Sequence, residues 1–577
     1  MNAPISITGF GIICAIGNDA SQVLESLRNG RSGIGQMKYL ESKHSDLPVG
    51  EVKLSNEEMK SMLGVTAPGQ VSRTSLMGAI AVRQALAHAG ITDISGKRVV
   101  LISGTTVGGM DLTERYYLQM KAGKPHPDIP HGNECGKSTD EIAELAGLGG
   151  VETCTVSTAC SSALNSIILG AEMIDNGEAD IVIAGGSESL SKYHLNGFNT
   201  LMILDSKPCR PFDDTRTGLN LGEGAAFVVL ERDSPESMAY VTGYGNRCDA
   251  FHQTASSENG EGAYLAMKDA MEMAGLKSGD IQYVNAHGTG TPNNDASESQ
   301  ALKRIFGDSM PEVSSTKSFT GHTTSASGSI ETVICLLAMQ NDFTPANLGW
   351  KKQADGLITP TSGTTGIRLD NIVCNSFGFG GNDSSLVISR NRPETKSGHK
   401  DAFSSRTAAC ETVDSADMLA DLKEFISPME SRRMGKLMKA AHLAAFRALK
   451  DAGISCPDAI VTATSRGMLD ISMQFLEDIA SNDEEHLKPT LFMLSTHNTI
   501  SSAIAIRTGC HGYNITYSHG DESAHWAMRD AGRLIRTGKA GSVLVVSFDE
   551  MLPVFAGNPD AEEAESVFAK ALVLVRN

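Results

Sequence analysis

The chain has 577 residues, of which 41% are hydrophobic and 20% charged; these values are typical of a folded protein with a large core and exclude a mainly disordered chain. Its net charge of -19 at pH 7 opposes nonspecific binding to nucleic-acid phosphates and to anionic lipid surfaces. The 11 cysteines show no Cys-x-x-Cys spacing, which indicates reduced thiols in a reducing compartment and argues against a metal site.

The N-terminal segment predicts no export signal and no membrane anchor. No basic residues precede its apolar run, and no stretch of the chain reaches 18 continuous apolar residues. We therefore expect the protein in the cytoplasm.

An internal repeat predicts the fold class. Residues 5–11 (Ile-Ser-Ile-Thr-Gly-Phe-Gly) are echoed by residues 239–245 (Ala-Tyr-Val-Thr-Gly-Tyr-Gly), and each copy is followed by a helical pattern that ends at an Ala-Gly pair. Such alternation of strands and helices is typical of a mostly parallel sheet that is covered by helices on both faces. The short apolar runs that predict strands are residues 99–103, 181–184, 225–230 and 283–286.

Further along the chain, a cysteine stands in a turn of small residues. Cys160 lies within residues 156–163 (Val-Ser-Thr-Ala-Cys-Ser-Ser-Ala), where an amphipathic helical stretch begins. A thiol at the first turn of a helix is near the positive end of the helix dipole, which favours the thiolate. Cysteine also suits acyl transfer between thioesters, because exchange of one sulfur for another keeps the acyl carbon activated. The segment therefore predicts a thioester enzyme with Cys160 as its nucleophile.

Two histidines follow in glycine-flanked loops. His287 lies in residues 285–292 (Asn-Ala-His-Gly-Thr-Gly-Thr-Pro), and His322 follows a glycine shortly after Lys317. Neutral imidazoles can donate N–H to a thioester carbonyl, so both histidines are candidates for the chemistry. A glycine-rich segment at residues 375–381 (Asn-Ser-Phe-Gly-Phe-Gly-Gly) completes the set.

These motifs, together with Thr-Ala-Cys-Ser-Ser at 158–162 and Cys-Arg-Pro-Phe-Asp at 209–213, resemble those of the β-ketoacyl-[acyl-carrier-protein] synthases, the elongating ketosynthases of the thiolase-like superfamily. Their order and spacing agree with that family over residues 1–392. The resemblance implies an α/β fold, the layered αβαβα thiolase-like fold with an internal duplication. The nucleophile would lie in a first half, residues 1–250, and the two histidines in a second half, residues 251–392.

The resemblance also implies a mechanism. An acyl carrier protein would deliver an acyl chain to Cys160, and the enolate formed by decarboxylation of malonyl-carrier protein would attack it, which gives a β-ketoacyl product two carbons longer. Backbone N–H groups of Cys160 and Phe379 would hold the oxyanion, while two neutral imidazoles donate hydrogen bonds. The catalytic set would be Cys160, His287, His322 and Lys317, with Lys317 orienting the network through Glu298 and Phe379 also acting as an acyl gate.

Other positions that match the family are expected to contact the substrates. The chain ends the glycine-rich loop with Asn382-Asp383 where the family has Thr-Asn, so an additional carboxylate is expected near the nucleophile. No metal is expected, and no cofactor beyond the phosphopantetheine arm of the carrier. The expected substrate-binding residues are Thr289, Thr291, Gly378, Gly380, Val107 and Phe198.

The expected partners are an acyl carrier protein and either a second copy of the chain, in a homodimer, or a ketosynthase-like domain. Nucleic acid and membrane insertion are not expected. Because carrier proteins are acidic like this chain, docking needs a local basic patch. The candidate side chains, each also compatible with ordinary solvated surface, are Lys121, Lys124, Lys207, Arg210 and Arg216.

A third copy of the repeat follows a polar linker at residues 393–403. Residues 524, 538 and 549 overlay residues 163, 177 and 188, and this register sets Asp521 at the position of Cys160. An aspartate cannot accept an acyl group by thioester exchange, and no counterpart of the histidine loops follows. The third copy is therefore expected to be catalytically inactive, a truncated version of the first half.

The third copy, residues 404–577, is similar in this respect to chain-length factors, the inactive partners of ketosynthases. Similar half-domains accompany aryl-polyene and flexirubin-type pigment genes, which favours a polyene pathway. Two alternatives stay open: a housekeeping synthase of fatty-acid elongation, and a nonenzymatic scaffold that pairs with another synthase. The combination of Cys160, His287, His322 and Lys317 argues against the scaffold.

Overall fold

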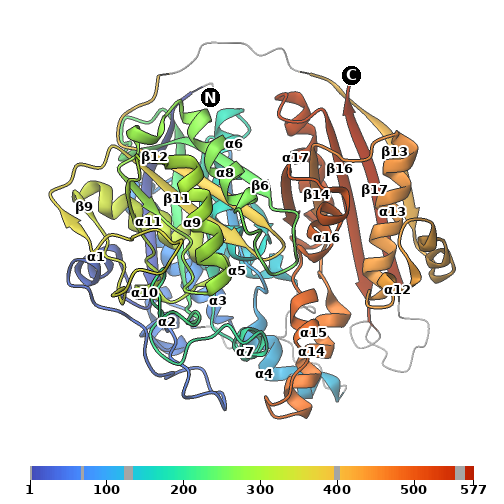
Figure 1. Ribbon diagram of the computed structural model, residues 1–577, viewed down its shortest axis with the longest axis horizontal. Helices are drawn as coiled ribbons and strands as arrows, with labels where there is room; N and C mark the ends of the chain where they lie inside the picture. The colour runs from blue at the N-terminus through green and yellow to red at the C-terminus, as the bar shows by residue number, and fades with distance from the viewer. Residues whose placement is uncertain (1–2, 67–69, 123–133, 395–402, 553–565) are drawn as a thin grey trace.

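The described residues form three α/β units on one mixed sheet of 15 strands (Figure 1). The linker expected at 393–403 lies almost wholly outside the described residues. The computed structural model describes residues 3–66, 70–122, 134–394, 403–552 and 566–577.

The first unit holds the sheet portion β3-β2-β4-β5-β1. Three strands expected from the sequence are present as β2, β4 and β5, and β2 is a fully buried run of Val, Leu and Ile, as a strand covered on both faces requires. The strands are β1 (Ile5–Cys14), β2 (Val99–Gly104), β3 (Glu152–Val156), β4 (Ile181–Glu188) and β5 (Gly224–Arg232). The helices are α1 (Ala20–Arg28), α2 (Asn56–Leu63), α3 (Arg73–His88), α4 (Met110–Lys121), α5 (Cys135–Ala146), α6 (Ser162–Asp175) and α7 (Lys192–Thr200).

The second unit holds the portion β8-β7-β11-β12-β6, in the same relative order. It begins with β6, upstream of the boundary expected at residue 250, because β6 pairs with β12 along nearly its whole length. The strands are β6 (Ala239–Cys248), β7 (Tyr283–Asn285), β8 (Glu312–Ser314), β11 (Asn371–Gly378) and β12 (Asn382–Ser389), with a separate pair β9 (Phe343–Thr344) and β10 (Thr364–Thr365). The helices are α8 (Glu261–Ala274), α9 (Pro292–Phe306), α10 (Lys317–Thr320) and α11 (Ser327–Gln340).

The third unit, residues 403–577, repeats the order once more as β15-β14-β16-β17-β13, so a third copy of the repeat is confirmed. Helix α13 covers one face of this portion and α17 the other. The strands are β13 (Ser405–Val413), β14 (Ala459–Ala463), β15 (Tyr513–Tyr517), β16 (Ser542–Met551) and β17 (Ser566–Arg576). The helices are α12 (Pro428–Ser431), α13 (Lys436–Ala452), α14 (Leu469–Ser481), α15 (Pro489–Leu494), α16 (Thr499–Thr508) and α17 (Ser523–Arg536).

The sheet is mixed, which corrects the expectation of a mostly parallel one. Strand β2 pairs in parallel with β3 and β4, but β5 is antiparallel to both β4 and β1. In the second unit only residues 379–381 separate β11 from β12, and so short a connection joins antiparallel strands alone.

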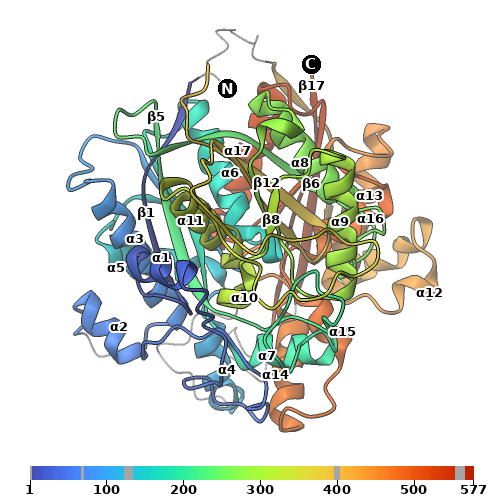
Figure 2. The ribbon, with the colours of Figure 1, turned by 60° about the vertical axis from the view of Figure 1, so that its left-hand side comes forward.

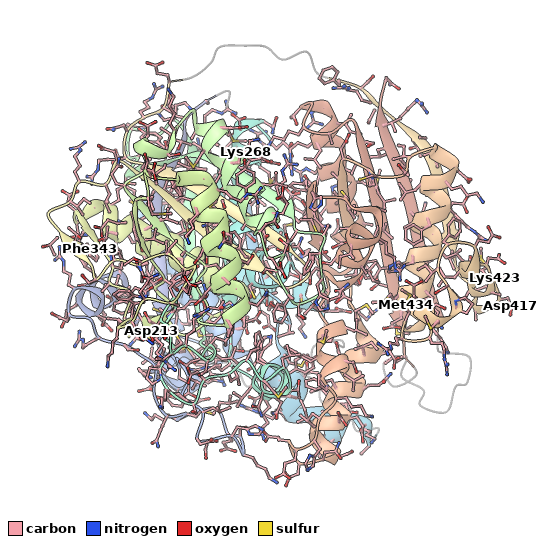
Figure 3. The ribbon with its side chains drawn as sticks, in the orientation of Figure 1. Asp213, Lys268, Phe343, Asp417, Lys423 and Met434 are labelled. Atoms are coloured by element: carbon pink, nitrogen blue, oxygen red, sulfur yellow. The ribbon has the colours of Figure 1, made fainter. Side chains whose placement is uncertain are left out.

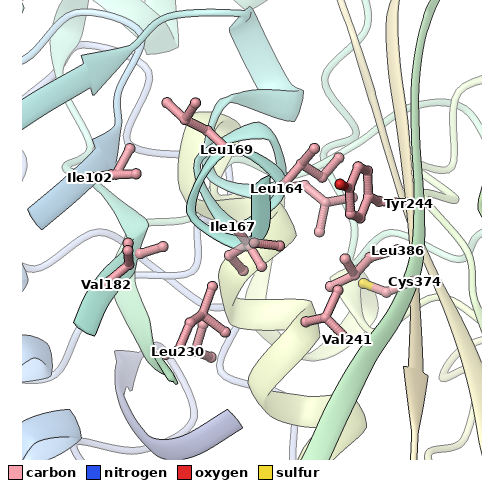
Figure 4. Close-up of a cluster of buried hydrophobic side chains, with 14 of the residues drawn as sticks. Ile102, Leu164, Ile167, Leu169, Val182, Leu230, Val241, Tyr244, Cys374 and Leu386 are labelled. Carbon is pink, nitrogen blue, oxygen red and sulfur yellow. The ribbon is translucent and has the colours of Figure 1, made fainter. Parts of the chain in front are cut away.

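The first two units form the layered thiolase-like fold. Helix α6 is buried from Ser162 to Ile174, and α11 is buried from Ser327 to Met339, because both helices lie between the two sheet portions. Figure 4 shows Leu164, Ile167 and Leu169 of α6 with strand residues on either side. The outer faces are covered by α3 and α5 on the first portion and by α8 on the second. This packing buries the start of α6 between the units.

The third unit joins the first at the edge strands β3 and β15, where Val156 pairs with Tyr517 in antiparallel orientation. Helices α14 and α15 of the third unit also pack against α7 of the first (Figures 1 and 2). Figure 3 places Asp213 and Phe343 on the side of the first two units and Asp417 with Lys423 at the far side of the third.

No helix within the described residues is long and apolar enough to cross a membrane. Among the same residues, no group of three or more His, Cys, Asp or Glu side chains is arranged to hold a metal ion.

Candidate functional site

The turn that carries Cys160 connects strand β3 to helix α6. The chain passes through the 3-10 turn Ala159–Ser161, in which Ala159 adopts a φ of 50°. A positive φ is unfavourable for a residue with a side chain, and the Ser162 hydroxyl holds the turn by accepting from the Thr158 N–H at 2.9 Å. Cys160 is thereby placed at the N-terminal end of α6 with 6% of its surface exposed.

Cys160 and the two predicted histidines lie together. His322 Nε2 is 3.2 Å from Cys160 Sγ, and His322 Nδ1 is 3.0 Å from the Ser327 hydroxyl. The His287 ring is 5.3 Å from the His322 ring between centroids and nearly perpendicular to it. Because a hydroxyl can donate or accept, Ser327 lets His322 carry its proton on either ring nitrogen.

His287 is held by a buried cation. Lys317 Nζ lies 3.2 Å from His287 Nδ1 and 2.6 Å from Glu331 Oε1. An ammonium group can only donate, so Nδ1 is the acceptor and the proton of the neutral ring is on Nε2. The Nε2–H is therefore the donor that His287 has for a substrate.

Lys317 forms its ion pair with Glu331, whereas Glu298 was the partner expected from the sequence. Glu298, on α9, accepts instead from the backbone N–H groups of His287 and Gly288 at 2.8 and 2.7 Å, so it fixes the loop rather than the ammonium group. Glu331 comes from the buried helix α11, which faces Lys317. The sequence did carry a signal for it, since an acidic residue within the otherwise uncharged helical stretch 327–339 must be paired to be buried.

Burial sets the ionisation of the site. Removal from water raises the pKa of the Cys160 thiol to about 11, although Lys317 and the backbone N–H groups of Phe379 and Cys160 lower it. The resting form is therefore the thiol, which corrects the thiolate expected from the helix dipole. Burial, and then the charge of Lys317, hold the pKa of His287 and of His322 well below the ordinary value, so both imidazoles are neutral.

The glycine-rich loop between β11 and β12 approaches the nucleophile closely. A Cβ on Gly378 would lie 2.7 Å from a backbone oxygen of the nucleophile turn, so only glycine fits. Gly380 and Gly381 adopt φ values of 86° and 75°, which reverse the chain. The Phe379 N–H is thereby directed at the Cys160 sulfur, beside the N–H of Cys160 itself. Two such donors are suited to hold an oxyanion.

A cavity of about 360 Å³ opens onto the cysteine and the two histidines. Asp383 also lines it, so the additional carboxyl group expected near the nucleophile is present, and burial, followed by the charges of Asp249 and Glu298, raises its pKa well above the usual value. Val107 does not line the cavity and packs in a hydrophobic cluster behind it, together with Phe198. The expected substrate residues that do line it are Thr289, Thr291, Gly378, Gly380 and Phe198.

The third unit reaches the same site, which the sequence did not predict. The Asn498 amide, at the start of α16, donates to the Phe379 carbonyl oxygen at 2.9 Å. The Phe492 ring, on α15, lies 5.4 Å from that of Phe198, which stacks in turn on Phe379 at 5.7 Å. These residues are far apart in the sequence, and no motif marks Asn498 or Phe492.

The third unit repeats the nucleophile turn with Asp521 in place of the cysteine. Gly520 has a φ of 53°, and the Ser523 hydroxyl accepts from the His519 N–H at 2.7 Å, as in the first unit. The register predicted from the sequence is confirmed by this backbone geometry.

Three of the basic side chains predicted for carrier docking form ion pairs within the chain. Lys124 lies outside the described residues. The pairs are Lys121–Glu477 at 2.6 Å, Arg210–Asp205 at 2.8 Å and Arg216–Asp295 at 3.3 Å.

Comparison with known families covers most of the chain. Residues 2–236 match the family described as "Beta-ketoacyl synthase, N-terminal domain", and residues 238–351 match "Beta-ketoacyl synthase, C-terminal domain". Residues 406–577 match a second family with the description "Beta-ketoacyl synthase, N-terminal domain", which agrees with the third copy of the repeat.

Similar proteins and solved structures point to the same family. The 3-oxoacyl-[acyl-carrier-protein] synthase 2 of Vibrio cholerae serotype O1 is 31% identical over 411 residues, which are 67% of this chain and 99% of that protein. The synthase 2 of Vibrio harveyi is 32% identical over 410 residues, 67% of this chain and 98% of that protein.

Among solved structures, "The ishigamide ketosynthase/chain length factor" is 28% identical with a TM-score of 0.64, and covers 68% of this chain and 100% of that one. The ketosynthase ApeO in complex with its chain length factor ApeC from Xenorhabdus doucetiae is 29% identical with a TM-score of 0.59, covering 67% of this chain and 98% of that one. The PfaC keto synthase-chain length factor covers 100% of this chain and 78% of that one with a TM-score of 0.77, and at 17% identity it shows the fold alone. With this geometry, fold and sequence similarity together, the chain belongs to the β-ketoacyl synthase family of acyltransferases.

Proposed function

We propose that Cys160 is the acyl-accepting nucleophile of a decarboxylative condensation that extends an acyl chain by two carbons. The observation that carries the proposal is the convergence of the thiol, two neutral imidazoles and two backbone donors on one cavity. A protein that only pairs with another synthase does not require a thiol, two imidazoles and two backbone donors around one cavity, so the nonenzymatic alternative is not favoured.

The first step transfers the acyl group from a carrier thioester to Cys160. Sγ attacks the carbonyl carbon, the C–S bond to the phosphopantetheine arm breaks, and the thiol proton passes through His322 Nε2 to the leaving sulfur. The oxyanion of the tetrahedral intermediate is held by the N–H groups of Cys160 and Phe379, which act in a buried site where hydrogen bonds are strong.

The second step joins the malonyl unit to the acyl group. Loss of carbon dioxide from malonyl-carrier leaves an enolate, whose carbon attacks the Cys160 thioester and breaks its C–S bond. The thiol proton left with the carrier in the first step, so the Cys160 sulfur takes a proton from solvent through His322 Nε2. His287 Nε2–H donates to the carbonyl oxygen on which the enolate charge develops, because Lys317 occupies Nδ1. A neutral ring suits this role, since an imidazolium would hold the malonyl carboxylate and oppose its departure.

The third unit serves in this proposal as a catalytically inactive partner that limits the acyl chain. Asp521 stands at the nucleophile position, and Phe492 with Phe475 closes the aromatic cluster behind Phe198. The solved ketosynthase and chain-length-factor structures support such a role. Like those proteins, this chain combines a ketosynthase with a second ketosynthase-like unit, and we assign it to polyene-type synthesis in the cytoplasm rather than to housekeeping fatty-acid elongation.

An acyl carrier protein is the proposed donor and acceptor, with its phosphopantetheine arm as the one prosthetic group required. The first test is intact mass spectrometry of the purified chain after incubation with acyl-carrier alone. We expect a mass increase equal to one acyl group, located on Cys160 and absent in Cys160→Ser. An unmodified chain with every saturated and polyene acyl-carrier offered would overturn the proposal.

A further inference from the structure

The third unit meets the first across a local two-fold axis. Beside the antiparallel contact of β3 and β15, the Ser157 N–H donates to the Thr516 carbonyl at 2.9 Å and the Ser518 N–H donates to the Thr155 carbonyl at 3.0 Å. Ser518 of the third unit corresponds to Ser157 of the first, and Thr516 corresponds to Thr155. The two hydrogen bonds are therefore the same bond formed in both directions. Such reciprocity defines an isologous contact between two copies of one fold.

Helices α6 and α17 flank this axis and carry opposite charges at equivalent positions. Glu172 and Arg533 are 361 positions apart, the separation that also relates the two copies of the nucleophile turn. Glu178 and Lys539, just beyond the ends of the two helices, are related in the same way. At both positions an acid in the first unit is replaced by a base in the third.

These four side chains contact one another across the axis. Arg533 Nε lies 3.0 Å from Glu172 Oε2, Lys539 Nζ lies 2.5 Å from Glu172 Oε1, and Arg533 Nη1 lies 3.6 Å from Glu178 Oε2. The side chains of Arg533 and Glu172 are 1% and 3% exposed, so water screens their charges little. Asp530, on α17 itself, also accepts from Arg533.

The same geometry is unfavourable for two identical partners. Two first units joined about this axis would bring Glu172 of each copy against Glu172 and Glu178 of the other. Two third units would oppose Arg533 and Lys539 in the same manner. Like charges that face each other in a buried interface destabilise the pairing of two identical units. In the pairing of a first unit with a third unit, each charge instead faces an opposite one.

We propose that this charge inversion specifies the pairing of the ketosynthase with its own third unit and prevents two ketosynthase copies from pairing through this face. The homodimer expected as one alternative from the sequence is thereby excluded at β3 and α6. The inference rests on the interface alone and holds whatever the acyl substrate of the site is.

The test separates the two parts of the folded chain. A specific protease site between Glu394 and Phe403 is cut after purification, and size-exclusion chromatography then shows whether the parts elute together. We expect native mass spectrometry of the uncut wild-type chain to give one copy of 61.1 kDa, and the cut parts to elute as a one-to-one complex. Lys539→Glu is the milder change, and it should raise the dissociation constant of the two cut parts at least tenfold. Arg533→Glu combined with Lys539→Glu should make the two parts elute separately.

A charge swap provides the decisive comparison if a reversed variant folds poorly. Glu172→Arg, Arg533→Glu and Lys539→Glu, combined with the neutral changes Glu178→Gln and Asp530→Asn, should restore folding and co-elution. Opposite charges then face each other again at positions 172, 533 and 539, and the two neutral changes avoid like charges against Arg529, Arg536 and position 533. Arg98→Glu, in an exposed ion pair within the first unit, is the matched control and should co-elute as the wild type does. Failure of the swap to restore co-elution, or wild-type dimers with cross-links from α6 to α6, would overturn the proposal.

Discussion

The Asn498 side-chain amide donates to the Phe379 carbonyl oxygen at 2.9 Å, so a residue of the third unit holds the loop whose N–H faces the Cys160 sulfur. Asn498 is fully buried. A series of buried hydrogen bonds continues from it to the nucleophile turn through Asn382, Asn514, Asn246, Asn165 and Thr158; Asn514 contacts Asn246 with its backbone N–H, and the other links join side chains. The two backbone segments that form the oxyanion site are thus connected through the third unit.

Replacement of Asn498 by Ala should slow acyl transfer to Cys160 by about tenfold, less than the hundred- to thousandfold cost of removing an oxyanion donor outright, because the Phe379 N–H remains but is no longer held in place. The rate is measured by quenched-flow mass spectrometry with acyl-carrier. Alkylation of Cys160 by iodoacetamide, which needs no oxyanion site, should be unchanged.

Thr496→Ala is the matched control, because Thr496 lies in the same loop and contacts Thr499 within the third unit. It should leave both rates at the wild-type values. An unchanged acyl-transfer rate in Asn498→Ala would show that the loop holds its shape without the third unit.

The raised pKa of Cys160 predicts how its reactivity depends on pH. With a pKa of about 11, the thiolate fraction rises tenfold for each pH unit throughout the range from about 7 to 9. The iodoacetamide rate, followed by intact mass, should therefore rise with unit slope and no plateau. A plateau below pH 9 would mean that the helix dipole and Lys317 outweigh burial.

The buried pair of Lys317 and Glu331 predicts a large effect on stability. Glu331→Leu leaves the Lys317 ammonium group without its carboxylate, and loss of one partner from such a pair costs about 3–5 kcal/mol in the free energy of unfolding. Lys317→Met combined with Glu331→Leu should recover most of that loss but not the condensing activity. Urea unfolding measures the stability; equal stability of Glu331→Leu and the wild type would contradict the assigned pair.

The aromatic cluster of Phe198, Phe492 and Phe475 predicts that added space beside the cavity changes the length of the product chain. Phe492→Ala removes the ring that lies 5.4 Å from Phe198 and leaves a void that a longer acyl chain can fill, so the product distribution should shift toward longer chains. Mass spectrometry of carrier-bound products measures the shift. Phe568→Ala, at an exposed position on β17, is the control and should not alter it; an unchanged distribution in Phe492→Ala would remove the third unit from chain-length control.

The sequence predicted the parts of the site that are carried by local motifs. Cys160, His287 and His322 stand in turns or loops whose glycines and small residues are required by close backbone approach, and Lys317 begins the short helix α10 just before the His322 loop. Each of them therefore belongs to a short run of sequence that can be recognised without the fold. The repeat likewise revealed the third unit and the register of Asp521, because the same backbone geometry requires the same small residues.

Contacts between segments that are distant in the sequence could not be predicted from local motifs. The sequence indicates that Glu331 needs a partner, but only the fold shows that this partner is Lys317. Only the fold shows, likewise, that Asn498 contacts Phe379, because such contacts depend on which faces of the elements pack together. The ionisation of Cys160 also reversed the local expectation, since burial within the assembled units outweighs the dipole of one helix.

Mass spectrometry of carrier-bound products, after the full chain is mixed with malonyl-carrier and with saturated or polyene acyl-carriers, measures the proposed condensation itself. We predict a β-ketoacyl product two carbons longer, formed by the wild type and absent with Cys160→Ser, with polyene acyl chains preferred. If no acyl group is captured on Cys160 and no such product forms from any acyl-carrier, the protein is not a condensing enzyme of this kind.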